Sequence, residues 1–255
     1  MFIQEVSIDI NSKINKDELF QEFNLLLSFY RDSGQTQGRI ESQYIDNNRI
    51  VSLPYTLEKK SLDKKNNNIY VNNWIKKIET LSNSLISIKT IGKTMENYNG
   101  CCTCEKSDFF ILMTNYVSID SPITCGSCNQ SVPLYRLPQY YDFGYMPILS
   151  WETNYQSCDR LQMNCEVGER WSLNQMQEIN SQLSKQGIEI CKKIQELTKI
   201  KTFYFLYNYK KYKADQSDRP CPGCGKKWNL KTPNDYFYDF KCNNCNIIST
   251  FSPNS

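Results

Sequence analysis

Four cysteines near the end of the chain have the spacing of a metal site. Cys221 and Cys224 form one C-x-x-C pair, Cys242 and Cys245 form another, and seventeen residues separate the pairs. Two such pairs about 15–20 residues apart are typical of a zinc ribbon. Two intervening residues let both thiolates reach one ion, and Gly223 and Gly225 can take the positive φ that such a turn needs. The spacing therefore predicts a tetrahedral Zn²⁺ site with Zn–S distances near ~2.3 Å.

A second set of cysteines predicts another site of this type. Cys125 and Cys128 form a C-x-x-C pair, and Cys101, Cys102 and Cys104 precede it. Only two of these three can complete a tetrahedron. Cys101 with Cys104 has the usual C-x-x-C spacing and is the pair we favour, while Cys102 with Cys104 is the tighter alternative. The predicted ligands of the two structural zinc ions are Cys101, Cys104, Cys125, Cys128, Cys221, Cys224, Cys242 and Cys245.

The ligand type restricts the chemistry. A Cys₄ site is closed and leaves no position for an activated water. The chain has no histidine, so Ser-His-Asp, Cys-His and histidine-based catalytic zinc sites are excluded. We therefore expect that the protein has no enzymatic activity. A thiol oxidoreductase using Cys158 and Cys165 is the least unfavourable activity, but we expect these two thiols and Cys191 to be buried.

The chain has features of a cytoplasmic protein. Its N-terminus, MFIQEVSIDI, lacks the basic and apolar regions of a signal peptide, and no apolar run approaches the ~18 residues of a membrane span. The cysteines are therefore expected to be reduced ligands rather than disulfides. Nothing in the sequence indicates a membrane partner or a small-molecule substrate.

The apolar pattern of the first ninety residues predicts one domain. Residues 2–10 indicate a strand, residues 16–33 a helix capped by Asn15, residues 39–46 and 49–57 two strands around an Asn47-Asn48 turn, residues 69–81 a helix and residues 85–91 a strand. The order β-α-β-β-α-β is that of a ferredoxin-like domain.

The remaining residues are harder to assign. Residues 109–119 and 203–209 read as strands, and residues 141–171 show no clear period. Ser172 is expected to open a long helix with Gln175 in its capping box, and Gly187 to weaken it midway. The expected fold is α+β, with a ferredoxin-like domain (1–95), a first zinc-ribbon unit (96–140), a helix-containing α+β connector (141–215) and a C-terminal zinc ribbon (216–255).

Positive charge is concentrated in one part of the chain. Residues 192–231 contain 11 basic and three acidic residues, although the formal charge of the whole chain is only +3. Aromatic residues stand among these lysines: Phe203, Tyr204, Phe205, Tyr207, Tyr209 and Tyr212. Such a stretch suits phosphate contacts with base stacking. The alternative is that the aromatic side chains pack in a core below a solvated basic face.

Three inner segments carry a family resemblance. SPITCGSCNQSVPLYRLP, SWETNYQSCDRLQMNCEVGER and LSKQGIEICKKIQELT, together with CPGCG and CNNC, resemble a family of uncharacterised bacterial zinc-ribbon proteins for which nucleic-acid binding has been suggested. The resemblance extends over almost the whole chain. It implies metal binding by Cys125, Cys128, Cys221, Cys224, Cys242 and Cys245.

Two function classes remain after these exclusions. The first is a nucleic-acid-binding protein that uses the basic aromatic stretch and the C-terminal ribbon. The second is an adaptor, or an inhibitory immunity-type partner of another protein, because zinc ribbons also serve as docking platforms. The residues outside 192–231 carry a net negative charge, which would suit a basic protein partner.

Overall fold

The computed structural model describes residues 1–11, 15–40, 42–94, 100–140, 144–209, 216–230 and 237–252. These residues form a mixed α+β fold, as the sequence predicts. The fold contains two β-sheets, and the chain divides into two compact units. The first unit comprises residues 1–101, 119–121 and 131–146, and the second comprises residues 102–118, 122–130 and 147–255. The predicted division into four parts stays a prediction.

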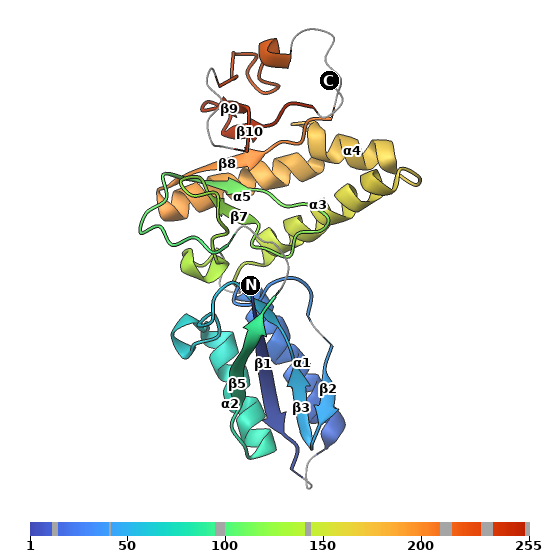
Figure 1. Ribbon diagram of the computed structural model, residues 1–255, viewed down its shortest axis with the longest axis vertical. Coiled ribbons are helices and arrows are strands. Elements are labelled where there is room, and N and C mark those ends of the chain that lie inside the picture. Colours follow the sequence, from blue (N-terminus) through green and yellow to red (C-terminus); the bar gives the residue numbers. More distant parts are fainter. Residues whose placement is uncertain are drawn as a thin grey trace. The chain divides into compact units, whose positions relative to one another are not determined.

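The first unit is built on an antiparallel sheet. Its elements are β1 (Phe2–Asp9), α1 (Lys16–Asp32), β2 (Tyr44–Asp46), β3 (Arg49–Ser52), β4 (Tyr55–Thr56), α2 (Ile69–Ser82) and β5 (Ser87–Lys93), with 3₁₀ turns at Lys64–Asn66 and Leu134–Arg136. Strand β1 lies between β5 and β3, β2 pairs with β3, and β4 pairs with the start of β1 (Figure 1).

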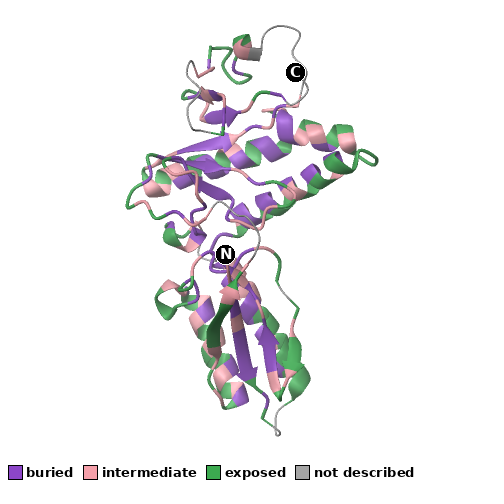
Figure 2. Cartoon of the chain, viewed as in Figure 1, coloured by how far each residue is buried: buried purple, intermediate pink, exposed green. Residues whose placement is uncertain are grey.

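Local signals in the sequence explain these elements. The side chain of Asn15 accepts hydrogen bonds from the backbone N–H groups of Asp17 and Glu18 and so caps α1. Asn47 and Asn48 both have positive φ in the turn between β2 and β3, as the predicted hairpin requires. Both helices contribute to one core, in which Val6 and Ile8 of β1 pack with Phe23 and Ile78. Figure 2 shows buried residues in purple along these strands and helices.

The second unit contains one five-stranded sheet in the order β7-β6-β8-β10-β9. The strands are β6 (Phe109–Leu112), β7 (Ile123–Cys125), β8 (Lys201–Phe205), β9 (Phe240–Cys242) and β10 (Ile247–Ser249). Strand β8 pairs in parallel with both β6 and β10, whereas β7 and β9 pair antiparallel to their neighbours. The strands of both cysteine-rich segments therefore belong to the same sheet.

The helices of the second unit are α3 (Met146–Asn164), α4 (Glu169–Gln177) and α5 (Gln182–Thr198), and a 3₁₀ turn covers Gln216–Asp218. Gly187 lets α5 approach the sheet closely, because a Cβ there would lie 2.2 Å from the ring of Tyr204 and 2.9 Å from Nε1 of Trp151. This glycine therefore serves close packing between α5, β8 and α3.

The prediction of one long helix that begins at Ser172 is wrong. Ser172 lies inside α4, the helix ends at Gln177, and a new helix begins after Ser181, whose hydroxyl accepts from the N–H of Ser184 at 3.0 Å. Gln175 does act as a cap, but of the following helix: its Oε1 accepts from the N–H of Leu183. The apolar stripe continues across both helices, which is why it reads as one.

Helix α3 accounts for most of the unassigned residues 141–171. Its buried positions include the polar residues Glu152, Asp159 and Gln162 as well as Trp151 and Tyr155. A buried face that mixes polar and apolar side chains gives no clear hydrophobic period. Strand β6 also ends earlier than residues 109–119 suggest.

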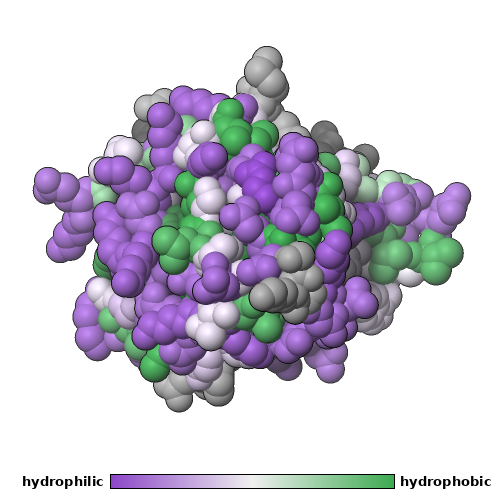
Figure 3. All heavy atoms as spheres, turned by 90° about the horizontal axis from the view of Figure 1, so that it is seen from below, coloured by the Kyte–Doolittle hydropathy of each residue, from purple (hydrophilic) through white to green (hydrophobic). Residues whose placement is uncertain are grey.

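Figure 3 shows one face of the molecule coloured by hydropathy. Hydrophilic residues cover most of the face in Figure 3, and hydrophobic residues are scattered between them. Among the described residues, no helix combines the length and the apolar character needed to cross a membrane.

Candidate metal centres

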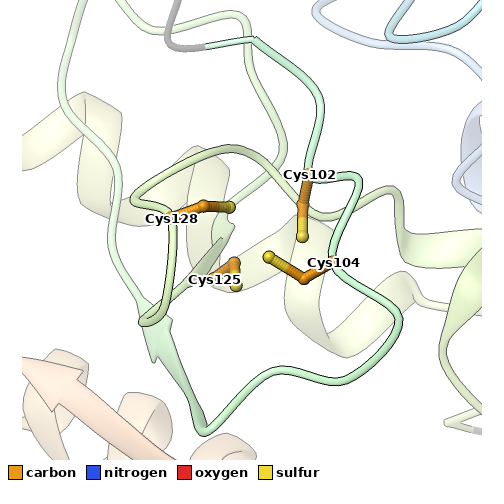
Figure 4. Close-up of side chains that lie close together, drawn as sticks. All are labelled: Cys102, Cys104, Cys125 and Cys128. Carbon is orange, nitrogen blue, oxygen red and sulfur yellow. The ribbon is translucent and has the colours of Figure 1, made fainter.

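Two groups of four cysteines come together in the second unit. The first Cys₄ group consists of Cys102, Cys104, Cys125 and Cys128, and the second of Cys221, Cys224, Cys242 and Cys245. Within each group all four sulfur atoms lie within 4.8 Å of one another. Figure 4 shows the four thiols of the first group pointing toward a common centre. Seven of the eight cysteines that the sequence predicts as ligands belong to these two groups.

The eighth of these cysteines, Cys101, lies outside the first group, which contains Cys102 instead. Residues 101–104 lack helical structure, and Cys101 forms a parallel bridge with Ser131. The backbone N–H of Cys104 donates to the sulfur of Cys102. Cys102 and Cys104 share the group, while Cys101 lies next to Arg136 and raises the pKa of that guanidinium against the effect of burial.

The Cys125–Cys128 segment forms a tight backbone turn. The N–H of Cys125 donates to the carbonyl of Gln130 at 2.9 Å, and the N–H of Asn129 donates to the carbonyl of Cys125 at 2.9 Å. Asn129 has φ 58°, a left-handed conformation that asparagine tolerates. The turn directs both thiols of the pair to the same side.

The second group repeats this turn. The N–H of Cys221 donates to the carbonyl of Lys226, and the N–H of Gly225, with φ 70°, donates to the carbonyl of Cys221. In the other pair, Cys242 faces Ile247 across β9 and β10, and Asn246 has φ 52°. Each of the three C-x-x-C pairs thus has a positive φ one residue after its second cysteine.

Glycines inside the two turns are required by space. A Cβ on Gly223 would lie 2.7 Å from the sulfur of Cys245, and a Cβ on Gly126 would lie 2.2 Å from the ring of Phe109. Gly223 is not among the residues with positive φ. Its expected role as a left-handed residue is therefore wrong, and its role is to leave room for the opposite thiol.

The polar surroundings favour a thiolate at one cysteine in each group. Burial raises the pKa of Cys125, but the Ser107 hydroxyl, 3.0 Å from its sulfur, and the N–H groups of Ser127 and Cys128 outweigh burial and lower the pKa to about 7. The backbone N–H of Lys226 is the main cause of a pKa of about 7 at Cys224. Thiolates are the form that binds metal.

The donor set fits a zinc ion at each group. Tetrahedral coordination with Zn–S of about 2.3 Å places neighbouring sulfurs roughly 3.8 Å apart. The sulfurs of Cys224 and Cys242 are 3.6 Å apart, and those of each group lie within 4.8 Å of one another. Four thiolates select soft or borderline ions such as Zn²⁺ over Mg²⁺ or Ca²⁺. Ser107, whose hydroxyl lies beside the sulfur of Cys125 in the first group, could not be identified from the sequence, because no motif marks it.

The other cysteines lie outside both groups. Cys158 and Cys191 are buried, as predicted, and burial raises the pKa of each thiol. Cys165 was expected to be buried but is exposed at the end of α3, where its thiol lies 3.4 Å from the carbonyl of Gln162. Cys158 also lines a cavity of about 490 Å³ between α3, α4 and α5.

The basic aromatic stretch divides between core and surface. Phe203 and Tyr204 are buried, so packing accounts for these two residues, whereas Phe205, Tyr207 and Tyr209 are half-buried. Tyr207 and Tyr209 stack with ring centroids 6.2 Å apart. Residues 210–215, which include Tyr212 and three lysines of the stretch, and residues 231–236 lie outside the described residues.

Comparison with known proteins places the chain among uncharacterised sequences. Three models described as domains of unknown function match residues 1–92 (DUF8589), 104–207 (DUF2310) and 210–255 (DUF8594). No solved structure matches the chain. An uncharacterised protein of Haemophilus influenzae is 32% identical over 239 residues, which cover 91% of this chain and 90% of the relative. A second uncharacterised protein of the same organism is 32% identical over 162 residues, covering 62% of this chain and 80% of that relative. The chain therefore belongs to the family of uncharacterised proteins that the longer-matching Haemophilus influenzae relative represents.

Proposed function

We propose that this protein is a non-enzymatic, nucleic-acid-binding protein whose two Cys₄ groups each hold a structural zinc ion. The single observation that carries the proposal is the sheet of the second unit, which has a Cys₄ group beside each edge strand and lysines among aromatic rings on one face. Four-thiolate zinc sites are closed, so the zinc ions fix backbone geometry and leave binding to the surface they hold.

In this proposal both cysteine-rich segments are zinc ribbons. The three C-x-x-C turns with positive φ, and the hairpin formed by β9 and β10 at Cys242, support this class. Cys102 and Cys104 depart from it, because their spacing is C-x-C and not C-x-x-C. The first unit is correspondingly a ferredoxin-like domain, supported by the antiparallel order β5-β1-β3-β2 with two helices in one core.

The position of the lysines supports a polyanionic ligand. Along β8, Tyr204 points toward Trp151 of α3, so its neighbours Phe203 and Phe205 point to the opposite face of the sheet. Lys201 and Lys241 lie on that face, with their ammonium groups 5.4 Å and 4.7 Å from the ring centroid of Phe203. Phe203 is buried, so the half-buried Phe205 is the ring of this face that remains for base stacking, while the two ammonium groups supply positive charge for phosphates.

Fluorescence anisotropy tests this function. The zinc-loaded protein is titrated into labelled single-stranded and double-stranded DNA and RNA at two salt concentrations. We expect binding that weakens steeply with salt, because phosphate contacts release counterions. Absence of binding to all four probes at low salt would contradict the proposal and direct attention to a protein partner.

A further inference from the structure

A second cluster of positive charge lies in the first unit. The loop of residues 58–66 contains four lysines, Lys59, Lys60, Lys64 and Lys65, and all four are exposed. Lys93, at the end of β5, is also exposed. These five residues, called here the lysine loop cluster, lie outside the basic stretch that the sequence pattern highlights.

Buried side chains hold the backbone of this loop. The amide of Gln4 donates to the carbonyl of Lys59 at 3.3 Å, and the amide of Gln35 donates to the carbonyl of Ser61 at 2.9 Å. Asn66 donates to the carbonyls of Lys60 and Ser61 at 2.8 Å and 3.1 Å. Gln4 and Gln35 are 1% and 0% exposed, so the loop is anchored from inside the unit while its lysines face solvent.

Little negative charge offsets these lysines. The acidic residues between positions 58 and 65 are Glu58 and Asp63. The carboxylate of Glu58 is already engaged, because Arg136 and the hydroxyl of Tyr135 each donate to it at 2.5 Å. The loop therefore presents a net positive surface.

An aromatic ring lies between two of the lysines. The ammonium groups of Lys59 and Lys93 lie 5.9 Å and 5.5 Å from the ring centroid of Phe2, which is half-buried. Leu62, the one apolar residue of the loop, is only 4% exposed. A membrane-binding surface combines basic residues with exposed apolar ones, so this arrangement favours a polyanion in water over a lipid surface.

We propose that the lysine loop cluster is a second contact surface for nucleic acid, which binds the phosphate backbone independently of sequence. The inference rests on the proposed nucleic-acid function and adds a location that the basic stretch does not include. Lysines act as point charges toward phosphates, and the anchored loop holds them without an ordering step on binding.

The test compares two variants with equal charge changes in the full-length, zinc-loaded protein. K59Q/K60Q/K64Q/K65Q removes the loop lysines, and K16Q/K76Q/K77Q/K89Q removes four exposed lysines elsewhere in the first unit. The probes are a labelled oligothymidylate and a labelled random-sequence DNA duplex, titrated between about 50 and 200 mM salt. Circular dichroism checks that both variants are folded.

We expect the loop variant to bind both probes more weakly. For the duplex, the slope of log K plotted against the logarithm of the salt concentration should become shallower by about 3, while the control variant keeps the wild-type slope. Wild-type binding that is unchanged in the loop variant would overturn this inference and leave the proposed function standing. Equal losses in both variants would also overturn it, because they indicate a general charge effect. Failure of the wild-type protein to bind these two DNA probes and the RNA probes of the anisotropy experiment would remove both proposals. If the wild-type protein binds RNA alone, the same comparison of the two variants on RNA decides the inference. Vesicles of anionic lipid serve as a third probe. If the loop variant lost binding to these vesicles while its nucleic-acid binding was unchanged, the result would overturn the inference and assign the cluster to lipid.

Discussion

The ammonium group of Lys241 lies 3.6 Å from the ring centroid of Phe109. Phe109 packs against Gly126 in the turn of the first Cys₄ group, and its carbonyl accepts the N–H of Gly126 at 2.8 Å. Lys241 directly precedes Cys242 of the second group. The two groups therefore share one small core, in which Phe109 and Phe203 also meet edge to face at 5.4 Å. From this arrangement we expect the two metal sites to stabilise the same sheet.

Removing one ligand of the second group should disturb the second unit alone. Cys224→Ser is expected to lose the C-terminal zinc and to expose β9 and β10, because much of the metal-binding free energy is folding free energy. The first unit has its own core and should stay folded. Hydrogen exchange measured by mass spectrometry reports both regions, with exposed Cys165→Ser as the matched control. Loss of protection in β1 and α1 would contradict the division into two units.

Removing the cation from the shared core should weaken the second unit. Lys241→Met keeps an unbranched side chain but loses the cation–π contacts with Phe109 and Phe203, which are expected to contribute about 1–2 kcal/mol at a partly buried position. Denaturant unfolding of the zinc-loaded protein measures this change. Lys193→Met, at an exposed position of α5, is the control. Equal stability of the two variants would show that the contact is energetically unimportant.

A methyl group on Gly126 should damage the first site. In Gly126→Ala the new Cβ would lie 2.2 Å from the Phe109 ring, so one of the two must move. Overpacking of this kind costs about 1–3 kcal/mol, and weaker zinc binding at the first group should accompany it. The control is Gly92→Ala, where a Cβ meets no described atom within 4 Å. Competition with a chromophoric chelator measures the zinc affinity of both variants. Similar zinc affinities in Gly126→Ala and Gly92→Ala would contradict the prediction.

The buried carboxyl of Asp159 should make stability depend on pH. Burial raises its pKa, although the N–H of Tyr116, which donates to it at 2.8 Å, acts in the opposite direction. A carboxyl with a raised folded-state pKa binds its proton more tightly when folded, so stability falls as pH rises through the window above the unfolded pKa. Asp159→Asn keeps an acceptor for Tyr116 and should be more stable than wild type at neutral pH.

Thermal unfolding at several pH values tests this expectation. The stability difference between Asp159→Asn and wild type should shrink as pH falls below the unfolded pKa of aspartate, near ~3.9. Asp108→Asn serves as a comparison, because that exposed carboxylate lies on the surface beside Ser127. A wild type more stable than Asp159→Asn at neutral pH would show that the charged form is favoured in the fold.

Local chemistry made much of the first unit predictable. Asn15, Asn47 and Asn48 act through their own backbone, so their effects can be read from neighbouring residues. The C-x-x-C pairs are equally local, because the ligands and the turn lie within six residues. These features were predicted from the sequence and are found in the structure.

Other features depend on distant residues. Cys102 and not Cys101 joins the first Cys₄ group, and Cys101 instead forms a bridge with Ser131, thirty residues away in sequence. The break between α4 and α5 arises where Ser181 and Gln175 cap a new helix, although the apolar stripe continues across it. The anchored lysine loop depends on Gln4 and Gln35, which come from other elements. Spacing and periodicity do not contain this information.

Zinc content of single-cysteine variants tests the central assignment most directly. The purified wild-type protein and Cys101→Ser should each contain two zinc ions per chain, and Cys102→Ser should contain one, because Cys102 lies in the first Cys₄ group and Cys101 does not. Metal analysis by mass spectrometry gives these numbers. One zinc in the wild-type protein, or loss of a zinc from Cys101→Ser but not from Cys102→Ser, would contradict the account.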